Sequence, residues 1–445
     1  MERSDSAGLS TLNFEAERPS EPPAIEGAKV FAPTFPLTLE ELDVNPDFLS
    51  ELALKTVSLE PDCTTVRTAE RMCLGQVITD QLLERLYNDK LIEKKGTVSL
   101  RNNRYGMTER GWARVEQLMD VNSYVGPAPV SLELYTEMIV SQVRSRPSVT
   151  KEMLEHTLRD LVLDEKVKRR LGVVASSGRS LFLSGPPGNG KTAIARALVD
   201  AILGGVWIPY AIEVDGQVIR VFDKHVHHSI EHPQNNYDRR GVIVRPPLVV
   251  VGGELTIQSL DLMATDSPRF YEAPFQLKAN GGVLVVDDLG RQRVSARELL
   301  NRWIIPLEYR IDYLTLSTGK KIQVPFEQLV IFATNLKDVD LVDEAFMRRM
   351  GYRMYVEPPS IETYKEIFRR YVRFAGLTID EQLIDRLLAR YKTERRQPKC
   401  CEPRDLVQRA IDLCKFDGRT IGLTADILDE AWESYFGGTN FPQAG

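Results

Sequence analysis

The sequence contains no run of about 18 consecutive apolar residues, so we expect no membrane-spanning helix and no membrane partner. The segment from Met1 to Pro36 also lacks the apolar stretch of a secretory signal peptide, and a cytoplasmic location is therefore the expectation. The five cysteines are odd in number and show no Cys-x-x-Cys spacing, which favours free thiols over disulfides or a structural metal site. A net charge of -6 gives no whole-chain indication of nucleic-acid binding.

Histidine is equally scarce, and four of the five histidines cluster at His225, His227, His228 and His232. If this segment were helical, His228 and His232 would share one face, which is a spacing used by metal-binding pairs. However, no cysteine and few carboxylates lie nearby in the sequence. We therefore expect a solvated loop rather than a metal site.

The chain divides into segments of different character, and 445 residues with 43% apolar content suffice for two or three domains. Residues 1–40, rich in Ser, Glu and Pro, are expected to be a disordered leader. In residues 41–120, helical periodicity is followed by a short hairpin and a last helix with Thr108 as its N-cap. This segment resembles a winged-helix domain. Residues 121–150 contain several prolines and are expected to form a linker with one helix.

The rest of the sequence first alternates between strands and helices and then becomes helical. Four apolar runs have the length of buried strands: Ser180–Leu183, Leu248–Val251, Val283–Val286 and Leu329–Phe332. Over residues 151–360 this alternation predicts an α/β fold with a parallel sheet between two layers of helices. Residues 361–445 are predicted to form a separate helical domain.

The clearest chemical signal is a glycine-rich loop between a predicted strand and a predicted helix. It consists of Gly185, Pro186, Pro187, Gly188, Asn189, Gly190, Lys191 and Thr192. Glycines let successive backbone N–H groups turn toward phosphate oxygens, and the helix N-terminus adds partial positive charge. Lys191 is expected to reach the terminal phosphates and Thr192 to coordinate Mg²⁺. The spacing therefore predicts binding of ATP with Mg²⁺.

Two other predicted strands end in polar side chains. Asp287 and Asp288 follow Val283–Val286, and Asn335 closes the run that begins at Leu329. Asp287 is expected to hold Mg²⁺ directly or through water, while Asp288 would orient or deprotonate the attacking water. Asn335 would reach between the second carboxylate and the γ-phosphate. These side chains are the predicted catalytic machinery.

These three elements, in this order, resemble the AAA+ ATPases over about residues 150–435. The resemblance places Asn335 at the family's sensor 1 position. It also implies that ATP binds between the subunits of a ring, with a homo-hexamer as the expected assembly and a client protein as the expected partner.

The resemblance further implies two kinds of arginine that contact the phosphates. Asp343–Arg349 resembles the segment that supplies an arginine finger to the neighbouring subunit, and Arg349 is favoured over Arg348, with Arg353 as a third candidate. Glu402-Pro403-Arg404-Asp405-Leu406 resembles the sensor 2 motif at the start of a lid helix. Arg404 is therefore expected to contact the phosphates from the helical lid.

Two predicted hairpins indicate which group of AAA+ ATPases the chain resembles. The stretch between Lys191 and Asp287 is longer than in ordinary AAA+ domains, so residues 207–247 are an expected insertion, with a hairpin turn at Asp215–Gly216. A second hairpin, around Thr318–Lys320, resembles the insertion that precedes sensor 1. Groups with this insertion include MoxR-like ATPases, magnesium-chelatase subunits, RuvB-like motors and bacterial enhancer-binding activators. The MoxR-like group is favoured.

Three functions remain open. The favoured one is a MoxR-like, chaperone-type motor that hydrolyses ATP to remodel a client protein. The second is a DNA-associated regulator or helicase-loader-like ATPase that uses the winged helix, although residues 41–145 hold more acidic than basic side chains. The third is a nucleotide switch with little hydrolysis, because most of the family has glutamate where this chain has the shorter Asp288.

Overall fold

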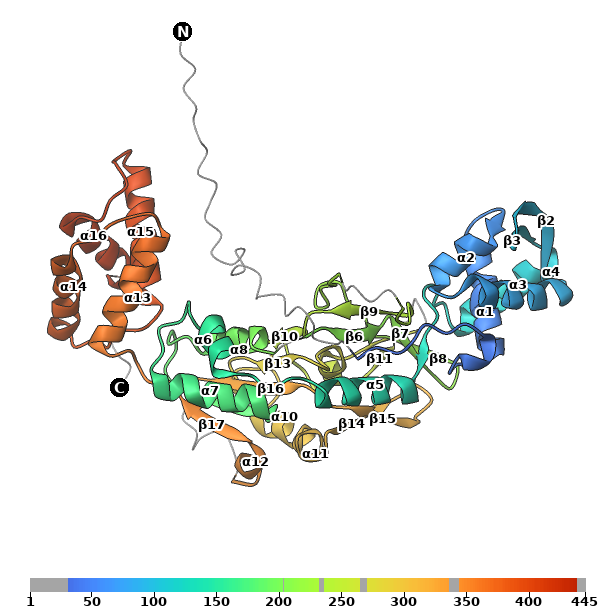
Figure 1. Ribbon diagram of the computed structural model, residues 1–445. Helices are drawn as coiled ribbons and strands as arrows, with labels where there is room; N and C mark the ends of the chain where they lie inside the picture. The colour runs from blue at the N-terminus through green and yellow to red at the C-terminus, as the bar shows by residue number, and fades with distance from the viewer. Residues whose placement is uncertain (1–30, 203, 232–235, 265–269, 336–343, 438–445) are drawn as a thin grey trace, which may run out of the picture.

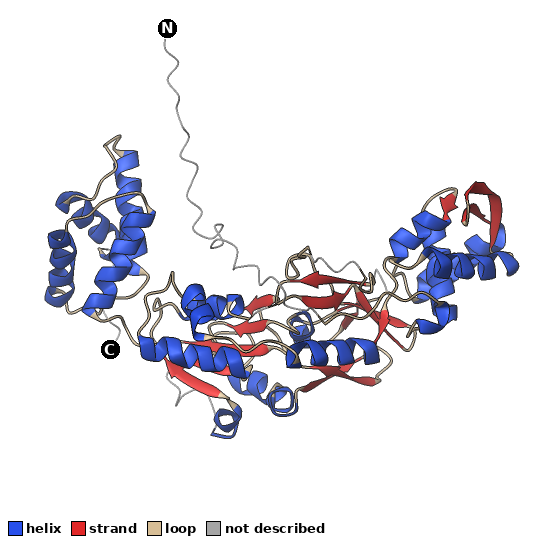
Figure 2. Cartoon of the chain, viewed as in Figure 1, coloured by secondary structure: helices blue, strands red, loops and turns tan. Residues whose placement is uncertain are grey.

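The computed structural model describes residues 31–202, 204–231, 236–264, 270–335 and 344–437. The molecule is elongated, with a small N-terminal domain at one end, a body built around β-sheets in the middle and a helical C-terminal domain at the other end (Figure 1). Most strands gather in the central body (Figure 2). The expected leader, residues 1–40, falls largely outside the described residues and stays a prediction.

The N-terminal domain packs helices and a hairpin around one apolar core. Its elements are η1 (Leu39–Glu41), α1 (Pro46–Ser58), β1 (Cys63–Thr64), α2 (Thr65–Met72), α3 (Gln76–Asn88), β2 (Ile92–Ser99), β3 (Asn102–Met107) and α4 (Glu109–Val121). Leu49 on α1 and Leu82 on α3 are fully buried in this core. The Thr108 hydroxyl accepts a 3.0 Å hydrogen bond from the N–H of Gly111, which confirms the predicted N-cap. The assignment to the winged-helix fold remains a prediction.

The central sheet has five parallel strands in the order β10–β13–β16–β5–β17. The strands are β5 (Leu181–Ser184), β10 (Leu248–Val251), β13 (Val283–Val286), β16 (Leu329–Thr334) and β17 (Tyr352–Tyr355). The four runs predicted as buried strands all lie in this sheet. The parallel pairing confirms the predicted α/β class.

Alternate side chains of the strands face two separate apolar cores, so the body around this sheet has three layers. Val283 and Val285 belong to one core, whereas Leu284 and Val286 belong to the other. The first core is covered by α6 (Lys151–Thr157), α7 (Glu165–Ser177) and α8 (Lys191–Asp200), and the second by α10 (Ala296–Arg302), α11 (Ile304–Tyr309) and α12 (Glu344–Arg349). The three-layer αβα architecture predicted from the alternating pattern is therefore confirmed.

Most residues between α8 and β13 form additional structure beside the central sheet. The elements are β6 (Val206–Pro209), β7 (Ala211–Val214), β8 (Gln217–Arg220), β9 (Gly241–Val244), η2 (Gln258–Leu260), β11 (Met263–Ala264), β12 (Tyr271–Glu272) and α9 (Phe275–Lys278). β7 and β8 are the predicted hairpin, and its turn residues Asp215 and Gly216 have φ angles of 52° and 78°. Positive φ at both positions is what a two-residue turn of this kind requires.

A second predicted hairpin packs on this additional structure. The elements concerned are β4 (Val130–Ser131), α5 (Leu132–Arg144), β14 (Ile311–Thr315) and β15 (Lys321–Pro325). Leu314 and Ile322 of the hairpin share an apolar core with Trp207 and with Tyr135 of α5. Residues 121–150, the expected linker, thus contribute a strand and a helix to this core, and the division into domains stays a prediction.

The C-terminal domain is built from α13 (Ile361–Phe374), α14 (Glu381–Thr393), α15 (Glu402–Phe416) and α16 (Ala425–Phe436). Its core is rich in aromatic side chains, among them Tyr391 and Trp432, whose ring centroids lie 4.6 Å apart. The domain contacts the glycine-rich loop, because the N–H of Cys401 donates a 2.9 Å hydrogen bond to the carbonyl of Gly188. Within the described part of the chain, no helix has the length and apolar character needed to cross a membrane.

Candidate nucleotide-binding site

The glycine-rich loop connects β5 to α8 at the carboxyl edge of the central sheet. Gly185, Gly188 and Gly190 have φ angles of 144°, 81° and 83°, which side chains rarely permit. A Cβ atom on Gly185 would lie 2.4 Å from the carbonyl oxygen of Val356, so only glycine fits at this position. The loop therefore curls around the N-terminus of α8, where free backbone N–H groups and the helix dipole favour an anion.

Lys191 begins α8 and is only 7% exposed. Its Nζ donates hydrogen bonds to the carbonyls of Gly185 (2.8 Å) and Pro186 (3.0 Å) and to Oδ1 of Asn335 (2.6 Å). Burial lowers the pKa of the Lys191 ammonium group, while the neighbouring carboxylates act in the opposite direction. The ammonium group is thus held at the loop, as the phosphate-binding role predicted for it requires.

Thr192 and Asp287 form the second contact of the site. The hydroxyl of Thr192 donates a 2.7 Å hydrogen bond to Oδ2 of Asp287. Hydroxyl and carboxylate oxygens are the ligands that Mg²⁺ prefers, together with phosphate oxygens and water. The two side chains predicted to hold Mg²⁺ are therefore neighbours, and their donor atoms fit that ion.

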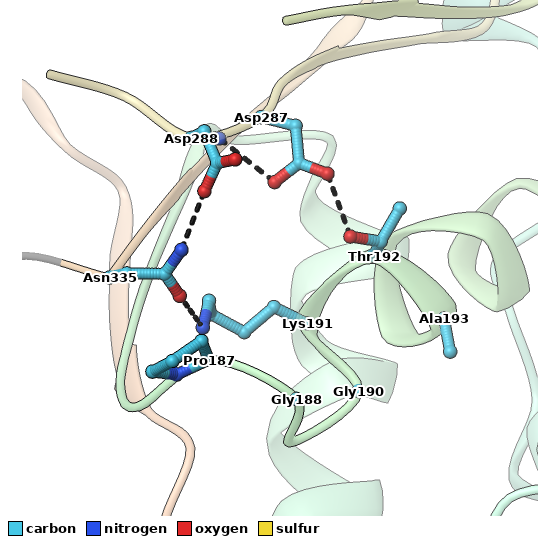
Figure 3. A pocket seen from close by; sticks show the side chains of 9 residues that line it. All are labelled: Pro187, Gly188, Gly190, Lys191, Thr192, Ala193, Asp287, Asp288 and Asn335. Atoms are coloured by element: carbon cyan, nitrogen blue, oxygen red, sulfur yellow. Dashed lines mark hydrogen bonds between the residues drawn. The ribbon is translucent and has the colours of Figure 1, made fainter. Parts of the chain in front are cut away.

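Asp288 and Asn335 form the third contact. Nδ2 of Asn335 donates a 2.5 Å hydrogen bond to Oδ1 of Asp288, so the Asn335 amide links this carboxylate to Lys191 (Figure 3). Asp288 itself has a φ angle of 50°, in the left-handed region. The residue that carries the predicted catalytic carboxylate thus has a backbone conformation that few residues with a side chain adopt.

All three contacts face one cavity with a volume of about 210 Å³. Its lining residues are Pro187, Gly188, Gly190, Lys191, Thr192, Ala193, Asp287, Asp288 and Asn335 (Figure 3). Among the predicted loop residues, Gly185 and Pro186 contribute carbonyls that hold Lys191. Asn189 faces the C-terminal domain instead, because its Oδ1 accepts a hydrogen bond from the N–H of Cys400 (3.3 Å).

The arginines that the AAA+ resemblance assigns to the phosphates do not line this cavity. Nε of Arg349 donates a 2.8 Å hydrogen bond to Oε2 of Glu308, and Arg348 is exposed. The guanidinium of Arg353 contacts the Met347 carbonyl. Their predicted action on a neighbouring subunit stays a prediction.

Arg404, predicted to act from the lid, also lies away from the cavity lining. Its Nε donates a 2.9 Å hydrogen bond to Oδ1 of Asp405, and its side chain is 46% exposed. Asp343, the first residue of the predicted finger segment, lies outside the described residues. The structure thus brings together the loop, the two aspartates and Asn335, and leaves every predicted arginine outside.

One residue of this region went unnoticed in the sequence. Nε2 of Gln292 donates a 2.8 Å hydrogen bond to the carbonyl of Asp287, and its Oε1 accepts one of 2.8 Å from the N–H of Gly290. Gln292 therefore closes the turn that follows the acidic pair. The only local sequence signal is Gly290, which indicates a turn but not the side chain that completes it.

The histidine segment differs from the expected solvated loop at one position. His227 is 2% exposed, its Nδ1 accepts a 2.9 Å hydrogen bond from the N–H of Asp223, and its Nε2 lies 2.9 Å from the carbonyl of Lys278. Burial lowers the pKa of His227 to about 4. The solvated-loop prediction is therefore wrong for His227, which is a packed, neutral side chain.

Two of the other clustered histidines lie within the part of the chain that the structure describes. His225 and His228 are exposed, whereas His232 lies outside the described residues. In the described ranges, no group of three or more His, Cys, Asp or Glu side chains is arranged to hold a metal ion.

Comparisons with known families match two parts of the chain. Residues 157–236, which include the glycine-rich loop, match the family described as magnesium chelatase, subunit ChlI. Residues 360–434, which form the C-terminal helical domain, match a domain of unknown function (DUF8689). No curated protein matches the chain.

The solved structures with similarity to this chain include those of NtrX and RuvB. NtrX from Brucella abortus in complex with ADP is 18% identical, with a TM-score of 0.39, over 66% of this chain and 59% of NtrX. NtrX in complex with ATP is 17% identical, with a TM-score of 0.37, over 68% and 64% of the two chains. RuvB from Thermotoga maritima, a Holliday junction branch migration motor, is 15% identical, with a TM-score of 0.37, over 65% and 72%. The chain thus spans less than two thirds of NtrX.

The phosphate loop between β5 and α8, the acidic pair after β13 and the asparagine after β16 share one edge of a parallel sheet. Together with the ChlI match over the loop, this arrangement is an AAA+ ATPase-like P-loop fold.

Proposed function

We propose that this protein is an AAA+-type ATPase that binds ATP with Mg²⁺ and hydrolyses it to remodel a client protein, as a MoxR-like, chaperone-type motor. One observation carries the proposal: Lys191, Asn335 and Asp288 form a hydrogen-bonded chain on one side of a cavity, and Thr192 and Asp287 form a pair on the other side. A cation for phosphate, oxygens for Mg²⁺ and a carboxylate for water thus face one space.

The side chains have separate roles in this proposal. The loop amides and Lys191 bind the phosphates, and Lys191 exchanges its contacts with the carbonyls of Gly185 and Pro186 for contacts with phosphate oxygens. Thr192 and Asp287 hold Mg²⁺, which when bound would neutralise charge on the β- and γ-phosphates.

Asp288 and Asn335 act on the water that attacks the γ-phosphorus. Asp288 orients this water and accepts its proton, and Asn335 holds the Asp288 carboxylate in place through their 2.5 Å hydrogen bond. Because Asn335 also contacts Lys191, the same amide is near the γ-phosphate when ATP is bound.

The charge balance of the cavity supports a site completed by another subunit. Among the described residues that line it, Lys191 is the one cationic side chain, facing the carboxylates of Asp287 and Asp288. A triphosphate therefore needs further positive charge, and an arginine from a neighbouring subunit supplies it in phosphoryl-transfer enzymes. We propose a homo-hexamer in which Arg349 or Arg348 plays this part.

The surface of the N-terminal domain supports a protein client over DNA. On β2, Lys94 is paired with Glu84 at 2.5 Å and Lys95 with Asp62 at 2.9 Å, so local acids offset part of the charge that phosphate binding would use. Leu100 at the hairpin tip is 92% exposed, and Val98 near it is 52% exposed. Exposed apolar side chains suit a protein partner better than a phosphate backbone.

The proposal is tested by measuring phosphate release and ATP affinity on purified protein with Mg²⁺. Lys191→Ala is expected to lose both, whereas Asp288→Asn should keep ATP affinity and lose at least about 100-fold in kcat. Lys166→Ala, which changes an exposed lysine on α7, is the matched control and should behave as wild type. If the wild-type protein binds ATP but releases no phosphate, the motor proposal is wrong and the nucleotide-switch hypothesis takes its place.

A further inference from the structure

The carboxylates of Asp287 and Asp288 face the same cavity, although consecutive residues of a strand point to opposite faces of a sheet. Along β13, Val283 and Val285 face the core covered by α8, and Val286 faces the opposite core. Continued alternation would place Asp287 on the α8 side, beside Thr192, and Asp288 on the other. A change of backbone direction after Asp287 is therefore needed to bring Asp288 into the cavity.

That change is the left-handed conformation of Asp288, whose φ is 50°. Aspartate and asparagine occupy this region more readily than other residues with a side chain, because their short polar groups bond locally. Here the Asp288 carboxylate bonds to Asn335, and the local bond comes from Asp287, whose Oδ1 accepts a 2.9 Å hydrogen bond from the Asp288 N–H. The conformation still has to be held by its surroundings, because it is intrinsically unfavourable for an L-residue.

Two sets of contacts hold it. On the sheet side, the N–H of Leu289 donates to the Ala333 carbonyl (2.8 Å), and the hydroxyl of Thr334 donates to the Leu289 carbonyl (2.9 Å). These bonds fix the residue after Asp288 to β16, next to Asn335.

On the solvent side, the side chain of Gln292 closes the turn. Its amide donates to the Asp287 carbonyl and accepts from the Gly290 N–H, both at 2.8 Å, while the Arg291 N–H donates to the Asp288 carbonyl at 2.9 Å. One side chain thus satisfies a backbone group on each side of Asp288. Gln292 is not part of the cavity lining, so it acts on the site only through this turn.

We propose that Gln292 is a positioning residue for ATP hydrolysis, which holds the left-handed turn that directs the Asp288 carboxylate to Asn335 and into the cavity. The proposal rests on the ATPase function proposed above. It also accounts for aspartate at position 288, since the turn that Gln292 closes tolerates a short carboxylate better than a longer one. The backbone conformation of the turn and the short side chain of Asp288 therefore suit each other.

The test separates chemistry from binding by measuring kcat, KM and ATP affinity for two variants. Gln292→Leu has a similar size and removes both hydrogen bonds, so kcat should fall about tenfold or more, with KM and ATP affinity within about twofold of wild type. Gln292→Glu keeps the acceptor for the Gly290 N–H but places a carboxylate oxygen against the Asp287 carbonyl, so its kcat should also fall, with ATP affinity kept. Gln382→Leu, an exposed change on α14, is the control and should change neither quantity.

Each outcome is decisive. An active wild type with an unchanged kcat in Gln292→Leu overturns the role of Gln292 alone. A wild type without turnover overturns the ATPase function and, with it, this role. If Gln292→Leu fails to bind ATP, Gln292→Glu decides: reduced kcat with intact affinity supports the positioning role, and parallel loss of both overturns it.

Discussion

The hydroxyl of Thr192 and a carboxylate oxygen of Asp287 lie 2.7 Å apart in a hydrogen bond, although 95 positions separate the two residues in the sequence. Thr192 stands in the first turn of α8, and Asp287 follows β13. The contact joins the phosphate loop to the acidic strand end across β16, which lies between β5 and β13 in the sheet. Two oxygens from different elements thus lie side by side, as the proposed Mg²⁺ site requires.

Replacing Thr192 should therefore change the Mg²⁺ dependence of hydrolysis. Thr192→Val keeps the shape of the side chain but removes the hydroxyl, so kcat should fall at least about tenfold and more Mg²⁺ should be needed for half-maximal turnover. Thr192→Ser keeps the hydroxyl and should retain most activity. Titration of Mg²⁺ at saturating ATP measures the effect, and equal Mg²⁺ curves for Val and Ser would contradict the assignment.

The polar residues that line the cavity could be predicted from the sequence, because each of them belongs to a local pattern. Lys191 and Thr192 open a helix after glycines, and Asp287, Asp288 and Asn335 end apolar strands. Carboxyl ends of parallel strands meet at one edge, so these residues were expected to be neighbours. The structure places all of them at one cavity.

The features that could not be predicted from the sequence depend on contacts that no motif or periodicity encodes. Gln292 matters because of a positive φ at Asp288, which no periodicity or motif reveals. His227 lies in a polar segment, yet packing beneath Phe222 buries it, with the two rings stacked 5.6 Å apart. The helix within residues 121–150 has an amphipathic pattern that gives no hint of its partner, which is the core around Trp207. The turn at Gln292 depends on local hydrogen bonds, whereas long-range packing decided the other two cases.

The buried His227 predicts a pH dependence of stability. Its pKa in the folded protein is about 4, below the ordinary value of 6.5, because burial disfavours the charged ring. Between these pH values the unfolded chain takes up a proton that the folded chain does not, so the free energy of unfolding falls as the pH drops from 6.5 toward 4. At about pH 5 the loss should be roughly 1–2 kcal/mol relative to about pH 7.

Urea unfolding followed by tryptophan fluorescence at the two pH values measures this loss. His227→Gln should be less stable at about pH 7, because the hydrogen bonds of the ring are altered, but its stability should change less with pH. Gln382→Leu, at an exposed position of α14, is the control and should keep the wild-type pH dependence. An identical pH dependence in wild type and His227→Gln would show that His227 is not the responsible group.

Arg349 and Arg348 offer a prediction about subunit interfaces. The side chain of Arg349 is 26% exposed and is oriented by Glu308, whereas Arg348 is exposed. If Arg349 is the finger, Arg349→Ala should lower kcat by about 1000-fold or more with little change in ATP affinity, and Arg348→Ala should have a smaller effect. Phosphate release and equilibrium ATP binding measure the two quantities.

Mixing subunits identifies whether such an arginine acts between chains. Arg349→Ala and Asp288→Asn proteins are each expected to be inactive alone. In a mixed ring, some interfaces pair an intact Asp288 with an intact Arg349 from the neighbour, so mixing should restore part of the activity. Absence of any recovery, in mixtures shown by mass measurement to contain both variants, would contradict a finger acting in trans.

The most pointed prediction concerns Asp288→Glu, which introduces the residue that most AAA+ ATPases carry at this position. The left-handed backbone of Asp288 and the 2.5 Å contact of its carboxylate with Asn335 leave little room for the extra methylene group of glutamate. We therefore expect kcat to fall about tenfold, and the free energy of unfolding to fall by about 1 kcal/mol, because glutamate is less tolerated in this conformation. Asp288→Asn is the control for stability, since asparagine tolerates the same backbone conformation, although its kcat should fall by at least about 100-fold. Thermal unfolding and phosphate release measure both effects, and a gain of activity in Asp288→Glu would mean that the turn adapts and that the aspartate, not the backbone, limits hydrolysis.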